Sequence, residues 1–304
     1  MSFENDGSDI PISQFRVAPG AQIDLTEHAT DWAGTPAMAA LSERKLKKNA
    51  KKFLKARVAE LADAQERLYA DDRYSLLLIF QARDAAGKDS TIKHVMSGVN
   101  PQGCQVHSFK APSKEELDHN YLWRCWKDLP ERGRIGIFNR SYYEEVLVVR
   151  VNPSILEGQK LPPEHVNEHI WAERYEDINA FERHMVRNGT VILKFFLHVS
   201  KEEQKQRFLD RLNEPEKHWK FSSSDLRVRG NWDVYDTAYQ DMLTATSTED
   251  APWYIIPADH KPVMRALVGH IIVQTLNGLD LQFPTLSDEE MARLDDARAH
   301  LMNE

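Results

Sequence analysis

Residues 82–89, ARDAAGKD, combine residue types and a spacing that could bind phosphate groups. They follow the template G-x-x-x-x-G-K-[ST], in which glycines allow a tight backbone path, N–H groups at a helix start bind the anion, and the lysine contacts the terminal phosphates. Gly87 and Lys88 are retained, but Ala82 replaces the first glycine and Asp89 replaces the hydroxyl. We therefore expect an anion-binding loop in which residue 82 avoids positive φ. A strand-to-helix turn that carries Gly-Lys by coincidence is the alternative.

Asp84 places a carboxylate inside this loop. A divalent ion that bridges phosphates takes oxygen ligands of this kind, so Asp84 is the candidate metal ligand. The same residue could instead cap the helix that follows, because Asp is favoured at helix N-caps.

A second candidate group follows the apolar stretch at residues 134–138, where an acidic residue that binds Mg²⁺ would be expected. The chain has Asn139 there, which can offer only a neutral oxygen, and then Arg140, whose planar guanidinium can clamp phosphate. Glu144 and Glu145 follow one turn later, and at least one of them could point at the site and orient an acceptor. Ordinary acids in the first turn of a helix explain the pair equally well.

Residues 201–229 carry a third set of charged groups, with Arg207 and Arg211 four apart on one helix face. Lys217 and Lys220 flank Trp219 after Pro215 ends that helix. The segment is similar to the arginine-bearing lid of P-loop kinases, which closes over the transferring phosphates. A solvated basic helix is the alternative. Lys110 also follows a strand and is expected to face the ligand crevice.

Five apolar runs and the helical patterns between them must position these residues. We expect strands at 75–80, 104–109, 134–139, 190–199 and 253–257, with helices from Gly87, Ser113 and Ser141 and a further helix from Lys261. This alternation predicts an α/β fold with a parallel sheet covered on both faces. Ligands of such sheets bind beyond the carboxyl ends of the strands.

The chain is expected to form a single domain, residues 1–304, with a lid at about 201–229. Residues 1–35 suggest a loosely attached arm, and residues 285–304 a helical tail. Apolar residues within 37–70 recur at helical spacing, which predicts a long amphipathic helix. Its run KKNAKK at residues 47–52 could contact phosphate, but a solvated helix face is the simpler interpretation.

Composition limits the class of protein. The chain has 304 residues, 41% hydrophobic residues and a net charge of −8, and no apolar run is long enough to span a bilayer. The negative charge disfavours generic nucleic-acid binding, so a polyanion requires a locally basic surface. The N-terminus lacks the pattern of a secretory signal, which predicts a cytoplasmic protein with Cys104 and Cys125 as reduced thiols and no cysteine metal site.

Taken together, the ordered motifs resemble those of the polyphosphate kinase 2 family. The resemblance covers roughly residues 41–279 and is carried by the loop with Ala82, Asp84, Gly87 and Lys88, by SFKAPS (108–113), by FNRSYYEEVLVVRV (138–151), and by RFLDRLNEPEKHWKFSSSD (207–225) with APWYIIPADHK (251–261). It implies a thymidylate-kinase-like P-loop fold with a helical lid, and phosphoryl transfer between inorganic polyphosphate and nucleotides with Mg²⁺, which Mn²⁺ could replace. It also implies a homo-oligomer, a dimer or tetramer, with no nucleic-acid or membrane partner.

The resemblance also implies roles for individual residues. The catalytic set is Asp84, Lys88, Arg140 and Glu144, with Asp84 on the metal. Asn139 followed by Glu144 resembles the class III branch that accepts both AMP and ADP. Residues expected around the phosphates or nucleotide are Ala82, Arg83, Ala85, Ala86, Gly87, Asp89, Ser90, Lys110 and Asn139. Lid residues expected to contact polyphosphate are Arg207, Arg211, Lys217 and Lys220.

The predicted function is therefore transfer of phosphoryl groups from polyphosphate to AMP and ADP. Two alternatives stay open. An ATP-dependent nucleoside or nucleotide kinase can carry a similar loop, and a polyphosphate- or nucleotide-binding module without turnover would explain the missing acid at Asn139.

Overall fold

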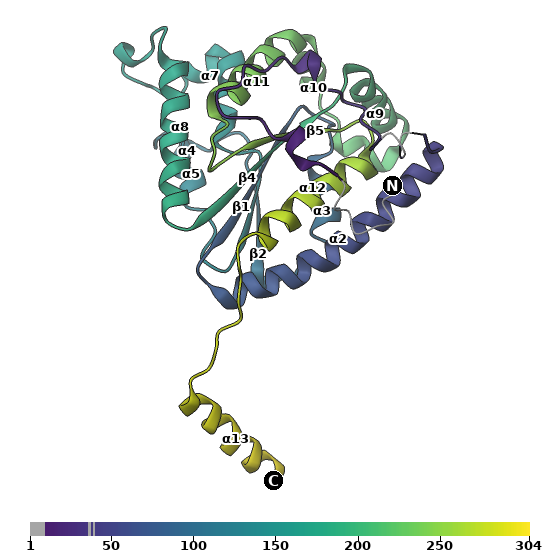
Figure 1. The fold of residues 1–304 in the computed structure, drawn as a ribbon. Coiled ribbons are helices and arrows are strands. Elements are labelled where there is room, and N and C mark those ends of the chain that lie inside the picture. The colour runs from purple at the N-terminus through teal and green to yellow at the C-terminus, as the bar shows by residue number, and fades with distance from the viewer. Residues whose placement is uncertain (1–9, 36–37, 39) are drawn as a thin grey trace.

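The computed structural model describes residues 10–35, 38 and 40–304. Its centre is a sheet of five parallel strands in the order β2-β3-β1-β4-β5 (Figure 1). The strands are β1 (Ser75–Ala82), β2 (Cys104–Ser108), β3 (Ile135–Asn139), β4 (Thr190–His198) and β5 (Trp253–Pro257). The predicted parallel sheet is confirmed, and each strand falls where an apolar run was found. Phe80 of β1 pairs with Asn139 of β3, so the loop after β1 lies beside the end of β3.

Helices cover both faces of the sheet, as the alternation of apolar runs predicted. One face packs against α2 (Glu43–Asp71), α3 (Lys88–Val95) and α12 (Lys261–Asn277), and the other against α8 (Ile170–Arg187) and α11 (Trp232–Thr246) (Figure 1). Alternate residues of β1 serve the two faces, because side chains alternate along a strand: Leu76 and Leu78 face the first, Leu77 and Ile79 the second.

The remaining elements lie between these strands and helices or at the two ends of the chain. They are η1 (Ile12–Phe15), η2 (Leu25–Glu27), η3 (Pro101–Gly103), α4 (Lys114–Leu117), α5 (Trp123–Trp126), η4 (Tyr142–Val146), α6 (Val148–Val151), α7 (Pro153–Glu157), η5 (Pro163–His165), α9 (Lys201–Asn213), η6 (Pro215–Lys220), α10 (Ser223–Gly230) and α13 (Asp288–Met302). Two of them correct the sequence prediction. The helix expected from Ser141 is a 3-10 turn, η4, and the helix expected from Ser113 is the four-residue α4, capped by Ser113.

The prediction of a loosely attached arm at residues 1–35 is wrong for the part that the structure describes, residues 10–35. Phe15 and Leu25 are buried in the two sheet-facing clusters. The backbone N–H of Val17 donates to the carbonyl oxygen of Trp253 at 2.8 Å, next to a bridge between Arg16 and Tyr254. This segment therefore adds an antiparallel contact at the edge of the sheet beside β5. Residues 1–9 lie outside the described part.

The predicted helical tail contains α13, which extends away from the sheet and its covering helices (Figure 1). None of its residues is buried. Among the described residues, no helix is both long and apolar enough to cross a membrane.

Candidate active site

The phosphate-binding loop follows β1 and ends at α3. Ala82 is the last residue of β1 and is extended, as predicted. The tight path is made further along, where Ala85 has a φ of 63° and Gly87 a φ of 114°. A left-handed residue that is not glycine costs about 1–2 kcal/mol, so other contacts must hold Ala85 there.

Helix α9 supplies those contacts through two side chains. Gln204 Nε2 donates to the carbonyl oxygen of Asp84 at 2.9 Å. Arg207 Nη1 donates to the carbonyl oxygens of Ala85 and Ala86 at 3.0 and 2.7 Å. In a planar trans peptide the N–H points opposite to the C=O, so carbonyls turned toward α9 leave the N–H groups of the following residues facing away from it. That is the side from which an anion would be bound.

The other donors of Arg207 are also occupied. Nη2 donates to the carbonyl oxygens of Ala258 and Asp259 at 2.6 and 3.1 Å, and Nε to Glu203 at 2.7 Å. A guanidinium has five N–H donors, so all five have an acceptor. Arg207 is 4% exposed. The structure therefore places Arg207 beneath the loop, joining it to the segment after β5, rather than among the lid residues that face solvent.

Lys88 and Arg140 meet at the carboxyl edge of the sheet. Lys88 is buried, and its Nζ donates to the carbonyl oxygen of Ala82 at 2.7 Å. Burial lowers the pKa of Lys88, as does the charge of Arg140, while Asp84 and Glu144 act in the opposite direction. Arg140 Nη2 donates to Asp84 Oδ1 at 3.2 Å. The structure thus brings these four predicted catalytic residues together.

Asn139 and Asp89 form a second contact between β3 and the loop. Asn139 Nδ2 donates to Asp89 Oδ1 at 2.7 Å. Ser90, which follows Asp89, directs its hydroxyl to the carbonyl oxygen of Gly87 at 2.9 Å. The two substituted motif positions, Asp89 and Asn139, are therefore partners of one another.

The chain turns sharply after β3. Arg140 has a φ of 65°, and its N–H donates to the carbonyl oxygen of Phe80 at 3.0 Å. This left-handed residue directs the following turn, η4, back over the site. Such strain in a residue that is not glycine is typical of functional sites.

Of the two acids in η4, only Glu144 faces the site. Burial raises the pKa of Glu144, while the charges of Arg140 and Lys88 lower it, and Gln81 lies beside it. Glu145 is turned away and is bound by Arg174 Nε at 3.1 Å and Gln159 Nε2 at 2.8 Å.

A buried polar network holds η4 in place. Lys194 in the middle of β4 forms an ion pair with Glu182 of α8 at 2.6 Å and also donates to the carbonyl oxygen of Thr246 at 2.7 Å. The hydroxyls of Tyr142 and Tyr143 donate to Glu182 at 2.8 and 2.7 Å. Both tyrosines lie between Arg140 and Glu144, so the network fixes the turn that carries them.

The residues at this edge fit a divalent cation. The structure describes no group of three or more His, Cys, Asp or Glu side chains that could enclose a metal ion. Mg²⁺ does not need one, because it is commonly held by one or two carboxylates together with phosphate oxygens and water. Asp84 offers such a carboxylate within the loop and would be the residue that holds the ion.

The remaining lid residues lie nearer the surface than Arg207. Arg211 is 3.7 Å from Asp225 of α10, Lys217 forms an ion pair with Glu214, and Lys220 lies over the exposed ring of Trp219. Burial raises the pKa of Asp225, and the charge of Asp84 raises it further. The start of α10 is therefore close enough to the site to sense Asp84.

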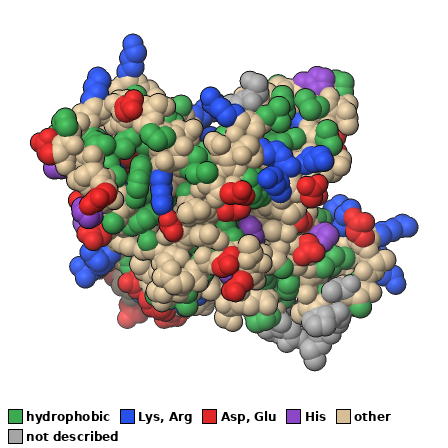
Figure 2. Space-filling model, turned by 90° about the horizontal axis from the view of Figure 1, so that it is seen from above, with side chains coloured by type: hydrophobic (Ala, Val, Ile, Leu, Met, Phe, Trp, Pro, Cys, Tyr) green, Lys and Arg blue, Asp and Glu red, His purple; other side chains and the backbone are tan. Residues whose placement is uncertain are grey.

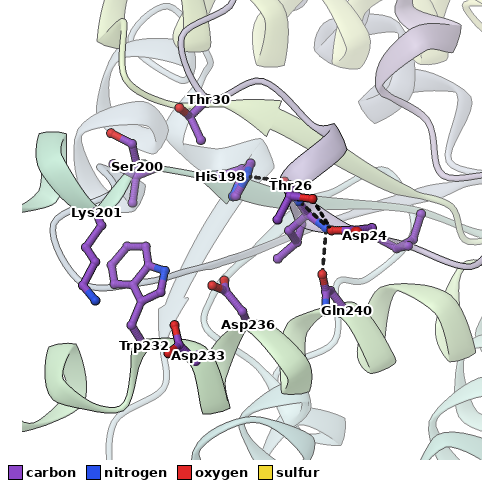
Figure 3. Close-up of a pocket in the computed structure, with 13 residues that line it drawn as sticks. Asp24, Thr26, Thr30, His198, Ser200, Lys201, Trp232, Asp233, Asp236 and Gln240 are labelled. Atoms are coloured by element: carbon purple, nitrogen blue, oxygen red, sulfur yellow. Dashed lines mark hydrogen bonds between the residues drawn. The ribbon is translucent and has the colours of Figure 1, made fainter.

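Two predicted residues lie apart from this group. Lys110 is exposed after β2, and its carbonyl oxygen accepts from Arg124. Arg83 is buried on the other side of the loop, where it pairs with Asp236 and lies 3.9 Å from the ring centre of Trp232. It adjoins a cavity of about 570 Å³ between residues 23–30, the end of β4 and the start of α11, and His198 and Lys201 are among the residues that line this cavity (Figure 3).

Sequence reasoning missed two polar residues of the site. Gln81 is fully buried at the end of β1 beside Glu144. Its place directly before the loop, at the carboxyl end of a strand, was a usable signal. Gln204 had no such signal, because only the fold brings α9 against the loop.

Comparison with known proteins shows the family of the chain. The profile of the polyphosphate kinase 2 (PPK2) family matches residues 44–284. The chain is 48% identical over 294 residues to an ADP-polyphosphate phosphotransferase of Rhodopseudomonas palustris, an alignment that covers 96% of this chain and 99% of the relative. It is 49% identical over 224 residues to an AMP/ADP-polyphosphate phosphotransferase of Meiothermus ruber, covering 74% and 80%.

A solved structure extends the agreement to the fold. The crystal structure of polyphosphate kinase 2 from Arthrobacter aurescens superposes with a TM-score of 0.83 at 36% sequence identity, covering 95% of this chain and 98% of the other. The predicted P-loop kinase-like fold is thereby confirmed. On the extent of the profile match and on these identities, the chain belongs to the polyphosphate kinase 2 family.

Proposed function

We propose that the protein transfers the terminal phosphoryl group of inorganic polyphosphate to AMP and ADP, with Mg²⁺ as cofactor. One observation carries this proposal: Lys88, Asp84 and Arg140 lie close together at the carboxyl ends of the strands, and Glu144 faces them. The names of the two relatives, which specify polyphosphate with ADP or with AMP and ADP, support the choice of substrates.

The chemistry requires positioning and charge neutralisation more than covalent catalysis. Lys88 and the loop N–H groups bind phosphate oxygens, and Arg140 neutralises charge as the phosphoryl group moves in line. Asp84 would hold Mg²⁺, which would supply further charge neutralisation at the phosphates; Mn²⁺ could take its place. No general base is needed, since the nucleotide phosphate is already an anionic nucleophile.

Two contacts within the site compete with phosphate for the same cations. Lys88 leaves the carbonyl oxygen of Ala82 for phosphate, and Arg140 gives up part of its contact with Asp84. Glu144 is proposed to supply the carboxylate that Asn139 lacks or to position AMP. A Glu144→Ala variant that phosphorylates AMP at the parent rate would contradict that role.

The test is nucleotide formation from AMP and polyphosphate with Mg²⁺ and no ATP. We expect ADP and ATP to form, and Lys88→Met to lower kcat/KM by roughly 10²–10³, the loss typical of one preorganised charge-stabilising group. Lys93→Met is the matched control, because Lys93 is exposed on the same helix. Activity only with ATP would indicate a nucleotide kinase, and binding without product, also with Mn²⁺, a non-catalytic module. A homo-oligomer and a cytoplasmic location stay predictions.

A further inference from the structure

The first half of α2 presents one strongly basic face. Its exposed cations are Arg44, Lys45, Lys47, Lys48, Lys51, Lys52 and Lys55. At 100° per residue these seven fall within an arc of about 160°. Leu46, Phe53 and Leu54 on the opposite side are buried. We call the seven cations the α2 basic face.

The exposure of these residues agrees with the predicted solvated helix face, but their charge pattern is unusual for one. Solvated faces usually mix charges, and like charges three or four residues apart repel one another. Within the described part of the chain only Lys47 of the seven has an ion pair, with Glu43 at 2.5 Å. The second half of α2 is different, with Glu60, Asp63, Glu66 and Asp71 against Arg57 and Arg67. The positive charge is therefore concentrated at one end, in a chain whose net charge is −8.

The start of α2 lies on the same side of the molecule as the phosphate-binding loop, at the carboxyl ends of the strands. Helix α2 ends at Asp71 and β1 begins at Ser75, so the last turn of α2 lies at the amino ends of the strands (Figure 1). Helix α12, which starts after β5, packs along α2: Gly269 is close to Leu54 of α2 and to Val95 of α3. Looking onto this edge, Lys and Arg side chains project at the right-hand side, where Figure 1 places the start of α2 (Figure 2).

Two further cations lie on α12, the helix that packs against the buried side of α2. Lys261 and Arg265 are on the first turns of α12, and burial together with the charge of Arg207 lowers the pKa of each. Arg207 itself contacts the loop carbonyls of Ala85 and Ala86. The cations at the start of α12 are therefore close to Arg207 and so to the catalytic edge.

We propose that the α2 basic face binds the part of a long polyphosphate chain that extends beyond the catalytic site. The inference rests on the proposed function, since that function supplies the polyanion. A protein of net charge −8 repels a long polyanion on average, and a local basic surface reverses this and releases counterions. Lysines suit such contact, because a flexible ammonium follows a mobile chain without fixed geometry.

One other occupant has complementary charge. Helix α13 carries Asp288, Glu289, Glu290, Asp295 and Asp296 against Arg293 and Arg298, and none of its residues is buried. The α13 of a second copy could therefore bind the same face. Polyphosphate is favoured because the face lies at the catalytic edge, and the experiment separates the two.

The test compares two triple variants with equal charge change. Lys48→Gln/Lys51→Gln/Lys55→Gln removes the centre of the α2 basic face. Lys93→Gln/Arg132→Gln/Lys160→Gln, at exposed positions elsewhere, is the control. For each protein, KM and kcat are measured with tripolyphosphate and with a long polyphosphate over a range of salt concentrations. Direct titration with both anions in the Lys88→Met background reports binding without turnover.

We expect the α2 variant to raise KM for the long chain about tenfold, with kcat and the tripolyphosphate KM changed less than about twofold. The slope of log KM against log salt should fall by roughly 2, which is three contacts at about 0.7 each. The control should leave both unchanged. Thermal stability should hold or rise, because like-charge repulsion is relieved.

Three results would overturn the proposal. The long-chain KM could stay unchanged, or the two anions could be affected equally. The variant could instead change only the sedimentation of the protein, which would assign the face to a second copy. Failure of the proposed function is a different result: the parent protein would then form no nucleotide product from either anion, while the binding titration still decides the role of the face.

Discussion

Replacing Arg207 tests directly whether this residue acts as a lid contact to phosphate or as a structural support of the loop. The sequence placed it with Arg211 as a phosphate contact, whereas the structure directs all its donors to Glu203 and to four backbone carbonyl oxygens. Two of these carbonyls belong to the phosphate-binding loop. Replacing Arg207 should therefore act on the loop and on stability before it acts on polyphosphate binding.

The expected size follows from the buried contacts. Arg207→Met leaves the carbonyl oxygens of Ala85, Ala86, Ala258 and Asp259 without this donor. An unsatisfied buried group costs about 1–3 kcal/mol, and relaxation keeps four of them from adding fully. We expect a loss of roughly 3–5 kcal/mol in the free energy of unfolding, the range for removing one partner of a buried charge. Arg207→Lys keeps the charge but not the fork, so about half of that loss should remain.

Urea denaturation measures the stability, and steady-state kinetics at a temperature where both variants are folded measure the catalytic effect. Arg207→Lys should lower kcat more than it changes the KM for tripolyphosphate, because the loop N–H groups lose their fixed direction. Arg211→Met is the control, since Arg211 is one turn further on and is 3.7 Å from Asp225. Arg211→Met should lower the free energy of unfolding by less than about 1 kcal/mol.

The opposite pattern would refute this reasoning. If Arg207→Met unfolds at the same urea concentration as the parent and changes only the KM for polyphosphate, Arg207 is a mobile lid contact. The hydrogen bonds to the loop would then contribute nothing measurable.

Two further predictions concern buried ionisable groups. Burial lowers the pKa of His198 and His270 from 6.5 to about 4, so between these pH values the unfolded chain binds more protons than the folded one. The free energy of unfolding should therefore be at its full value above pH 6.5 and fall toward pH 4 by up to about 3 kcal/mol per histidine. In the double variant His198→Gln/His270→Gln, the urea concentration at the midpoint of unfolding should depend less on pH over that range. Lys194→Met should lower the free energy of unfolding by about 3–5 kcal/mol, because it leaves Glu182 buried without its cation. Adding Glu182→Gln should recover part of that loss. Denaturation curves that show no recovery would contradict the ion-pair explanation.

The sequence predicted the sheet and the place of the site well, for a physical reason. The strands β1, β3, β4 and β5 are largely buried and are continuous apolar runs, so each of these runs located a strand directly, whereas the edge strand β2 is partly exposed. Because parallel strands end at one edge, the polar residues after β1 and β3 had to meet there. Asp84, Lys88 and Arg140 lie together as that rule requires.

Contacts that depend on the path of the backbone were not predictable. Helical spacing assigned Arg207 and Arg211 to one face, but only the fold shows that the loop carbonyls lie against Arg207. Likewise, the left-handed φ of Arg140 turns the chain into η4 instead of a helix, and no residue type announces that turn. The N-terminal arm was misjudged because its few buried residues, such as Phe15 and Leu25, have no regular period.

The contacts of α9 with the phosphate-binding loop limit which part of the predicted lid can move. Gln204 and Arg207 tie α9 to the phosphate-binding loop, so this helix cannot move without carrying the loop along. The far end is also tied, because Arg229 of α10 donates to the carbonyl oxygen of Lys201 at 2.7 Å and to Gln204 at 3.0 Å. Both ends of the predicted segment 201–229 are therefore anchored to the catalytic edge. Any closing motion over the phosphates must arise after Asn213, where α9 ends, and Lys217 and Lys220 lie on that part of the chain.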